Sequence, residues 1–402
     1  MRLLPDRPIH LTYCTNIHPA DGWTAVSDTL ARYAPALKRR LSPDAPFGLG
    51  LRLSARDVRE LRAGSHLTDF REWLDREGLY VAIINGFPYG AFHGTPVKAD
   101  VYAPDWRDDA RVAYTLDLIH VLSALVPAGM DGGVSTAPLS YKPWMGSATD
   151  DDWRRIAVNV ARVGEALVRL RQQSGAMIHL DIEPEPDCSI ENTDDTLSFF
   201  ERWLLPCGVP HLSEALGLSH EAARQALLDH IRVCFDCCHF AVEYEDPLAA
   251  IDRLTSAGIQ IGRVQLSSAI RVNLPADPAG RDLAIDRLRP FADSVYLHQV
   301  IEQGGPSLAH FPDLDAAFAA APHQNGGEWR VHFHVPLFTG EYNGLQSTQD
   351  YVRTVLDRAV ARPFTTHLEI ETYTWDVLPA NLKLDLLDSI GREYDWVLSA
   401  VR

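Results

Sequence analysis

The amino-acid sequence predicts an α/β protein with a (β/α)8 barrel, and three observations support this fold class. Short β-rich runs alternate with helical stretches along the whole chain, which is the pattern of parallel strands joined by crossover helices. In most of these runs, polar and apolar side chains fall on opposite faces. The length of 402 residues suits one barrel with an insertion.

Nine segments have the composition of β-strands, one more than the barrel needs. They are residues 10–17, 47–53, 79–85, 132–136, 177–183, 231–236, 261–267, 330–335 and 366–371. Residues 268–328 are irregular and rich in Gly, Pro and Ala, so we expect an insertion there, after the seventh barrel strand. Residues 330–335 would then return from the insertion toward the mouth of the barrel. We expect residues 1–402 to form a single domain.

Helices are expected between these strands. They cover residues 24–41, 54–61, 109–125, 150–172, 219–231, 247–257, 347–361 and 380–401. The helix at 54–61 opens with Ser54, a residue type that caps helix N-termini. An open doubly wound sheet is the alternative architecture, but neither GxGxxG nor GxxxxGK[ST] occurs at a strand end.

Composition limits the classes of function. The formal net charge of −17 argues against nucleic acid as the partner and favours a small-molecule substrate. Hydrophobic residues make up 46% and charged residues 23%, as in ordinary globular proteins. We find no signal peptide and no apolar stretch long enough for membrane insertion, and therefore expect a cytoplasmic protein.

Two strands carry the same polar pattern, His-x-acid-x-Glu, on one face. The polar residues are His179, Asp181 and Glu183 in one strand and His367, Glu369 and Glu371 in the other. The outward face of a barrel strand packs against helices, so the polar face must point inward. Unpaired carboxylates there would cost several kcal/mol each. We therefore expect a divalent cation to neutralise them, and the deeper Glu369 to hold His367.

The candidate metal ligands gather at strand ends. Asp236 and His239 form a D-x-x-H motif directly after one strand, while Glu183 and Glu371 end two others. These positions lie at the C-terminal mouth, where barrel active sites are found. Carboxylate and imidazole together suit Zn, Mn, Fe or Co.

Further ligands and substrate contacts are expected nearby. His332 and His334 share one face of residues 330–335, and at least one of them is expected to bind metal. A substrate phosphate or carboxylate could be held by Arg52, Lys98 or Lys142.

The cysteines leave a second kind of metal site open. Cys234, Cys237 and Cys238 could form a thiolate site, but a four-cysteine zinc site needs a second pair. Cys188 and Cys207 do not provide that spacing, so we expect the cysteines to be mostly small buried residues.

Together these residues resemble the xylose-isomerase-like TIM barrel superfamily, which includes sugar isomerases, epimerases and endonuclease-four-type nucleases. The resemblance implies metal ligation by Glu183, Asp236, His239, Gln265, His332, His334 and Glu371, with Glu183 and Glu371 catalytic and Arg52, Asn85 and Lys142 binding substrate. Epimerases of this group carry a histidine where this chain has Gln265. Its nucleases carry histidines where this chain has Asn85 and Ser135.

Five longer segments are similar to the EboE family of bacterial metabolite-traffic proteins. They are residues 11–19, 85–90, 180–188, 235–243 and 367–375. This resemblance implies work on a polyol, sugar or cyclitol-like metabolite, with other proteins of the same gene cluster as partners. We expect a metal-dependent isomerase or epimerase. The alternatives are a metal-dependent phosphoester hydrolase, with a second metal on His332 and His334, and a non-catalytic metabolite-binding module.

Overall fold

Eight parallel strands form the central sheet of the computed structural model, which describes residues 1–4, 7–94, 96–321, 326–379, 383 and 385–401. These strands are β2 (Arg7–Tyr13), β3 (Phe47–Arg52), β4 (Leu79–Asn85), β5 (Gly132–Thr136), β6 (Ile178–Ile182), β7 (Ile231–Asp236), β8 (Ile261–Leu266) and β15 (His367–Ile370). A ninth strand, β1 (Arg2–Leu4), pairs antiparallel with β2. The order β2-β15-β8-β7-β6-β5-β4-β3 brings the first and second barrel strands to opposite edges, and a parallel bridge between Cys14 and Gly50 joins those edges. The predicted (β/α)8 barrel is confirmed.

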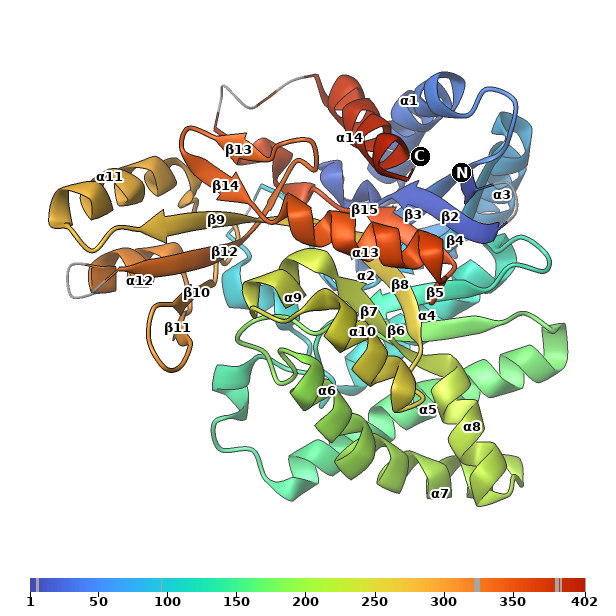
Figure 1. The fold of residues 1–402 in the computed structure, drawn as a ribbon. Coiled ribbons are helices and arrows are strands. Elements are labelled where there is room, and N and C mark those ends of the chain that lie inside the picture. Colours follow the sequence, from blue (N-terminus) through green and yellow to red (C-terminus); the bar gives the residue numbers. More distant parts are fainter. Residues whose placement is uncertain (5–6, 95, 322–325, 380–382, 384, 402) are drawn as a thin grey trace.

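Helices surround this barrel (Figure 1). They are α1 (Trp23–Leu41), α2 (Ala55–Leu61), α3 (His66–Glu77), α4 (Asp109–Leu125), α5 (Asp150–Ser174), α6 (Thr193–Phe199), α7 (Leu205–Leu216), α8 (His220–His230), α9 (Cys237–Val242), α10 (Pro247–Ser256), α13 (Gln349–Ala361) and α14 (Leu386–Ala400). Ser54 caps α2 through a reciprocal pair of hydrogen bonds with Asp57. The predicted helix at 380–401 begins at residues that lie partly outside the described ones, and α14 forms its remainder. Among the described residues, no helix combines the length and hydrophobicity needed to cross a bilayer.

A second, antiparallel sheet projects from one side of the barrel (Figure 1). Its strands are β9 (Ser268–Leu274), β10 (Val300–Gln303), β11 (Ala309–Phe311), β12 (Gly327–Val335), β13 (Glu341–Tyr342) and β14 (Leu345–Ser347), and it carries α11 (Pro278–Leu288) and α12 (Leu314–Ala320). The chain enters it directly after β8, the seventh barrel strand, and β14 extends beyond the expected end at residue 328. The extra predicted strand, residues 330–335, is part of β12 in this sheet. The single-domain organisation stays a prediction.

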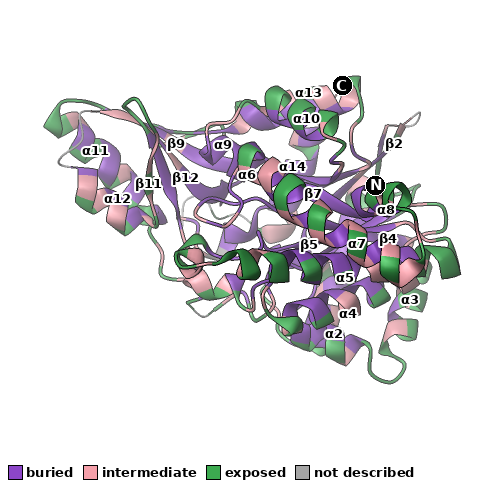
Figure 2. Ribbon diagram, turned by 90° about the horizontal axis from the view of Figure 1, so that it is seen from below, coloured by how far each residue is buried: buried purple, intermediate pink, exposed green. Residues whose placement is uncertain are grey.

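The barrel strands are mostly buried, as the purple ribbon in Figure 2 shows, and their apolar side chains form the core between sheet and helices. On β6, Ile178, Leu180 and Ile182 belong to this core, whereas the alternate residues His179 and Asp181 lie inside the barrel. The predicted alternation of faces therefore holds on β6.

An arginine neutralises the deepest carboxylates of the barrel. The guanidinium of Arg263 lies 3.0 Å from Asp181 and 3.3 Å from Glu369, and all three side chains are fully buried. The expectation that a divalent metal ion neutralises the inward carboxylates is wrong for Asp181 and Glu369, because the guanidinium of Arg263 neutralises both. Glu369 does not hold His367 either, since the His367 ring lies 3.2 Å from Asp131 at the other end of the barrel.

Candidate metal centre

A cavity of about 540 Å3, counting its part open to solvent, lies at the carboxyl ends of the barrel strands. Its polar wall contains the side chains of Asn16, Asn85, Glu183, Glu185, His239, His332, His334 and Glu371. Its apolar wall includes the aromatic rings of Phe87, Phe92, Tyr102, Tyr296 and Tyr373. The cavity therefore joins ionisable groups from several strand ends to a surface on which an organic ring can pack.

Three histidines present their Nε2 atoms to the same place. Each ring donates its Nδ1 proton to an oxygen: His239 to the carbonyl of Pro184 at 2.9 Å, His332 to Oε1 of Gln299 at 2.8 Å, and His334 to the carbonyl of Glu371 at 2.9 Å. With Nδ1 as the donor, each Nε2 presents a lone pair; that of His334 has no hydrogen-bond partner, whereas Nε2 of His239 and Nε2 of His332 lie 3.1 Å apart. Fixing the tautomer through Nδ1 is how proteins prepare histidines as metal ligands.

Asp236 adds a carboxylate oxygen to this group. Its Oδ1 accepts hydrogen bonds from the backbone N–H groups of Cys238 and His239 and from the Ser267 hydroxyl. Its Oδ2 is buried without a hydrogen-bond partner and lies 4.0 Å from Nε2 of His334. Although burial opposes it, the neighbouring histidines and the Ser267 bond lower the pKa of Asp236. An ionised oxygen is therefore available beside the free imidazole nitrogens.

Low basicity keeps two of the three imidazoles available as ligands. Burial lowers the pKa of His334 to about 4, and burial with the neighbouring His239 lowers the pKa of His332 well below its ordinary value. Both rings are thus neutral at physiological pH, as ligation requires.

Glu183 and Glu371 lie beside this group. Burial, followed by the neighbouring carboxylates, raises the pKa of each well above the usual glutamate range. Oε1 of Glu371 accepts hydrogen bonds from the amides of Asn16 and Asn85, at 2.8 and 3.0 Å, whereas Oε2 of Glu183 has no partner. These two carboxyl groups therefore hold their protons more tightly than an ordinary glutamate and can serve in proton transfer.

The sequence reasoning missed several residues of this site. Glu185 lies between two prolines after β6 and lines the cavity; burial raises its pKa to about 7. The Tyr102 hydroxyl donates to Glu185 at 2.8 Å, and the Gln299 amide donates to Tyr102. The motif Glu-Pro-Glu-Pro could have singled out Glu185, but the sequence gives no signal for Gln299, which lies outside every predicted strand.

The structure brings most of the predicted site residues together. Asp236 lies behind the cavity wall beside His334, and three others lie apart from the site. Gln265 is fully buried on β8, and its amide atoms make no hydrogen bond. Arg52 bonds the carbonyl of Gly90 and lies 3.7 Å from Asp57, outside the cavity lining. Lys142 pairs with Glu191 at 2.5 Å. Lys98, by contrast, does line the cavity and pairs with Asp313.

The donor set fits a divalent cation. Ligand atoms of Asp236, His239 and His334 lie within 4.8 Å of one another, as do those of Glu185, His239 and His332. Nitrogen and carboxylate donors of this kind suit zinc and its neighbours in the first transition row. The fold and the site together define a (β/α)8 barrel with a candidate metal centre at the carboxyl ends of its strands.

Comparison with known proteins finds similar barrels among solved structures. No protein-family model matches the chain, and no curated protein sequence matches it. A xylose isomerase-like TIM barrel protein from Mycobacterium smegmatis, in complex with magnesium, is 13% identical with a TM-score of 0.48, over 98% of this chain and 97% of its own.

Two further structures are similar over nearly the whole chain. The IolI protein with a bound zinc atom is 11% identical with a TM-score of 0.44, covering 98% of this chain and 99% of its own. The probable 3-DHS dehydratase AsbF from Bacillus anthracis is 11% identical with a TM-score of 0.43, covering 96% and 98%. Similarity at this level says nothing about chemistry, so the barrel assignment rests on the strand order.

Proposed function

We propose that the chain is a metal-dependent enzyme of the sugar isomerase or epimerase type, acting on a polyol, sugar or cyclitol-like metabolite. The observation that carries this proposal is the placement of Glu183 and Glu371, two buried carboxyl groups with raised pKa, at one cavity beside the donor group of Asp236, His239 and His334. Isomerisation and epimerisation both move a proton to or from a carbon next to a carbonyl, and groups with such pKa values suit that transfer.

Each residue has a distinct task in this proposal. A divalent cation held by Asp236, Glu183, Glu371 and the histidines would polarise a substrate carbonyl. Asn16 and Asn85 hold one oxygen of Glu371 and so orient its other oxygen. The unpartnered Oε2 of Glu183 can accept a proton from the substrate, and Glu371 can return one. The rings of Tyr296, Tyr373 and Phe92 provide an apolar face for the substrate and exclude water.

The substrate is expected to be a small metabolite, and the similarity to EboE proteins extends the proposal to metabolite traffic in the cytoplasm. Partner proteins from the same gene cluster belong to this extension. Mass spectrometry of small molecules that copurify with the chain would identify the compound class.

Metal content tests the proposal directly. We expect Asp236→Asn and Glu371→Gln proteins, purified with added zinc or manganese, to lose the bound metal that the wild type retains. Glu393→Gln is the matched control, because Glu393 is equally buried but bonds Thr372 and the Leu337 N–H away from the cavity. Stoichiometric metal in both site variants would contradict the proposal.

A second candidate function is a phosphoester hydrolase with two metal ions. It is favoured by the adjoining group of Glu185, His239 and His332: Glu185 and His332 would hold the second ion, and the one free nitrogen of His239 would bind the first. Two equivalents of metal per chain together with phosphatase activity would select this function, whereas one equivalent and proton exchange at a sugar carbon would select the isomerase.

A further inference from the structure

We propose that Cys238 is a thiolate ligand of the metal centre, together with His332 and His334, and that it makes the centre selective for zinc, cobalt or iron over magnesium and manganese. This inference rests on the proposed metal centre and adds a ligand of a different chemical class. The sequence leaves a thiolate site open but lacks the second cysteine pair of a four-cysteine zinc site; one thiolate among imidazoles suffices for this centre.

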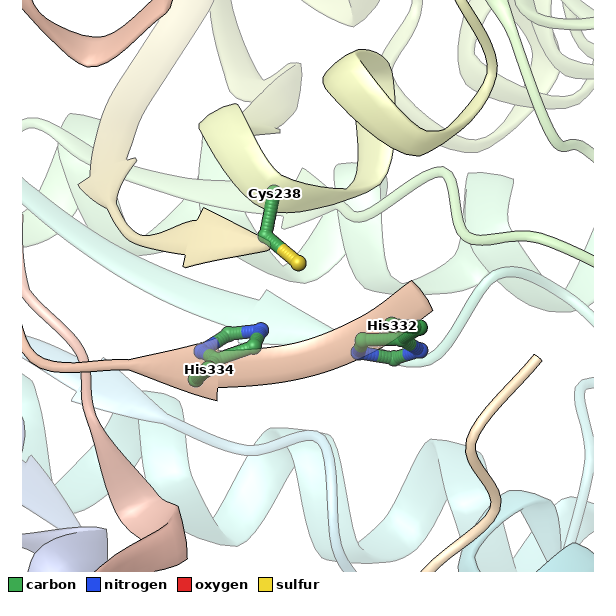
Figure 3. Close-up of side chains that lie close together, drawn as sticks. All are labelled: Cys238, His332 and His334. Atoms are coloured by element: carbon green, nitrogen blue, oxygen red, sulfur yellow. The ribbon is translucent and has the colours of Figure 1, made fainter. Parts of the chain in front are cut away.

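The geometry brings the three side chains together. Cys238 lies on α9, which starts directly after β7, and its side chain points toward β12 (Figure 3). His332 and His334 are two residues apart on one face of β12. The Sγ atom and one ring nitrogen from each histidine lie within 4.8 Å of one another, and all three residues are buried.

Unpaired polar atoms of the residues around Cys238 indicate a cation site. Nε2 of His334 and Oδ2 of Asp236 are both buried without a partner. Buried polar atoms are nearly always paired. These two unpaired atoms lie 4.0 Å apart, and a ring nitrogen of His334 lies within 4.8 Å of the Cys238 sulfur, so the arrangement points to one cation that serves all three residues. The backbone N–H of Cys238 is bonded to Asp236 and Ser267, which fixes the position of the residue.

Charge balance favours the thiolate form once a cation is present. Binding exchanges the thiol proton for the metal: the S–H bond breaks, a metal–sulfur bond forms, and the proton leaves to solvent. One thiolate and the Asp236 carboxylate then neutralise a divalent cation in a buried site. Thiolate sulfur is a soft ligand that binds zinc and its neighbours well and magnesium poorly.

The neighbouring cysteine provides a matched control. Cys237 lies on the same short helix and is equally buried, but it packs into the main hydrophobic core. Cys238 instead contacts a small cluster with Val242, Ala269 and Ile301. If both cysteines were only small buried residues, replacing either would have the same effect on metal binding.

Cobalt spectroscopy tests the inference. Wild-type protein titrated with Co2+ should bind it and show an intense sulfur-to-cobalt charge-transfer absorption in the near ultraviolet. Cys238→Ala should lose this absorption and bind cobalt at least tenfold more weakly, whereas Cys237→Ala should retain both properties. Cobalt bound by the wild type without the absorption, or a Cys238→Ala protein that keeps it, would overturn the inference while leaving the metal centre intact.

Two further measurements complete the test. Failure of the wild type to bind any cobalt or zinc would overturn both this inference and the proposed function. If Cys238→Ala does not fold, X-ray absorption on the zinc-loaded wild type should still show a sulfur neighbour at about 2.3 Å. A shell of nitrogen and oxygen alone would overturn the inference.

Discussion

The Nε2 atoms of His239 and His332 lie 3.1 Å apart, although both rings donate their Nδ1 protons to other oxygens. Two lone pairs that face each other at this distance repel unless a proton or a cation lies between them. Burial and the neighbouring histidines lower the pKa of His332, so its own Nε2 stays unprotonated and can bind a cation. The two nitrogens are therefore placed to bind one cation, and the ion pairs of Arg263 lie deeper in the barrel.

Gln299 is predicted to act through His332. Gln299→Leu removes the oxygen that accepts the Nδ1 proton at 2.8 Å, so the ring loses its fixed tautomer and orientation. Loss of such an outer hydrogen bond typically weakens metal binding about 10- to 100-fold. Competition with a chelator would measure the affinity. Gln303→Leu, an exposed change on β10, should leave it unaltered.

Arg263 is predicted to be essential for stability. Arg263→Met leaves the buried carboxylates of Asp181 and Glu369 without their counter-charge. Breaking a buried ion pair by removing one partner costs about 3–5 kcal/mol. Urea unfolding would measure this loss. Arg253→Met, which breaks an exposed pair with Asp194, should change the unfolding free energy by less than about 1 kcal/mol. Equal effects from the two variants would contradict the role of Arg263.

The contribution of Glu393 to stability is predicted to be lost as pH rises through neutrality. Burial raises its pKa to about 7 from an ordinary 4.5, so between these values the folded chain holds a proton that the unfolded chain has released. The contribution of Glu393 to the free energy of unfolding amounts to roughly 3 kcal/mol. It is complete below pH 4.5 and is lost as pH rises through about 7. Glu393→Gln should flatten the dependence measured by unfolding between pH 5 and 8, and an unchanged slope would contradict this assignment.

Metal removal is predicted to destabilise the fold. A cation that binds only the folded state stabilises it by about 3 kcal/mol when its free concentration is a hundredfold above Kd. Dialysis against a chelator should therefore lower the melting temperature, and added zinc should restore it. Asp236→Asn should show little response to either treatment, because its ligand set is incomplete. A wild type indifferent to chelator would argue against the centre.

The sequence predicted the barrel well because alternation along a strand depends only on local side-chain order. Ile178, Leu180 and Ile182 had to face the helices, and the opposite face had to point inward. The same reasoning found Asp236, His239, His332 and His334, since each lies at a strand end or on a polar face.

Pairing across the barrel could not be predicted in this way. Which carboxylates Arg263 neutralises depends on strand order and register, and Asp181 lies 82 residues from it along the chain. The tautomer of His332 depends on Gln299, a residue of the insertion directly before β10 with no local motif. The contacts of Arg52 also depend on residues distant along the chain. The sequence predicts this side chain at the substrate, whereas its guanidinium bonds the carbonyl of Gly90 and lies near Asp57.

Anomalous X-ray scattering from crystals grown with zinc would test the metal centre most directly. We predict one strong peak at the zinc edge within bonding distance, roughly 2 Å, of Nε2 of His334 and of Oδ2 of Asp236. No peak at this position, or zinc bound only to surface residues, would contradict it.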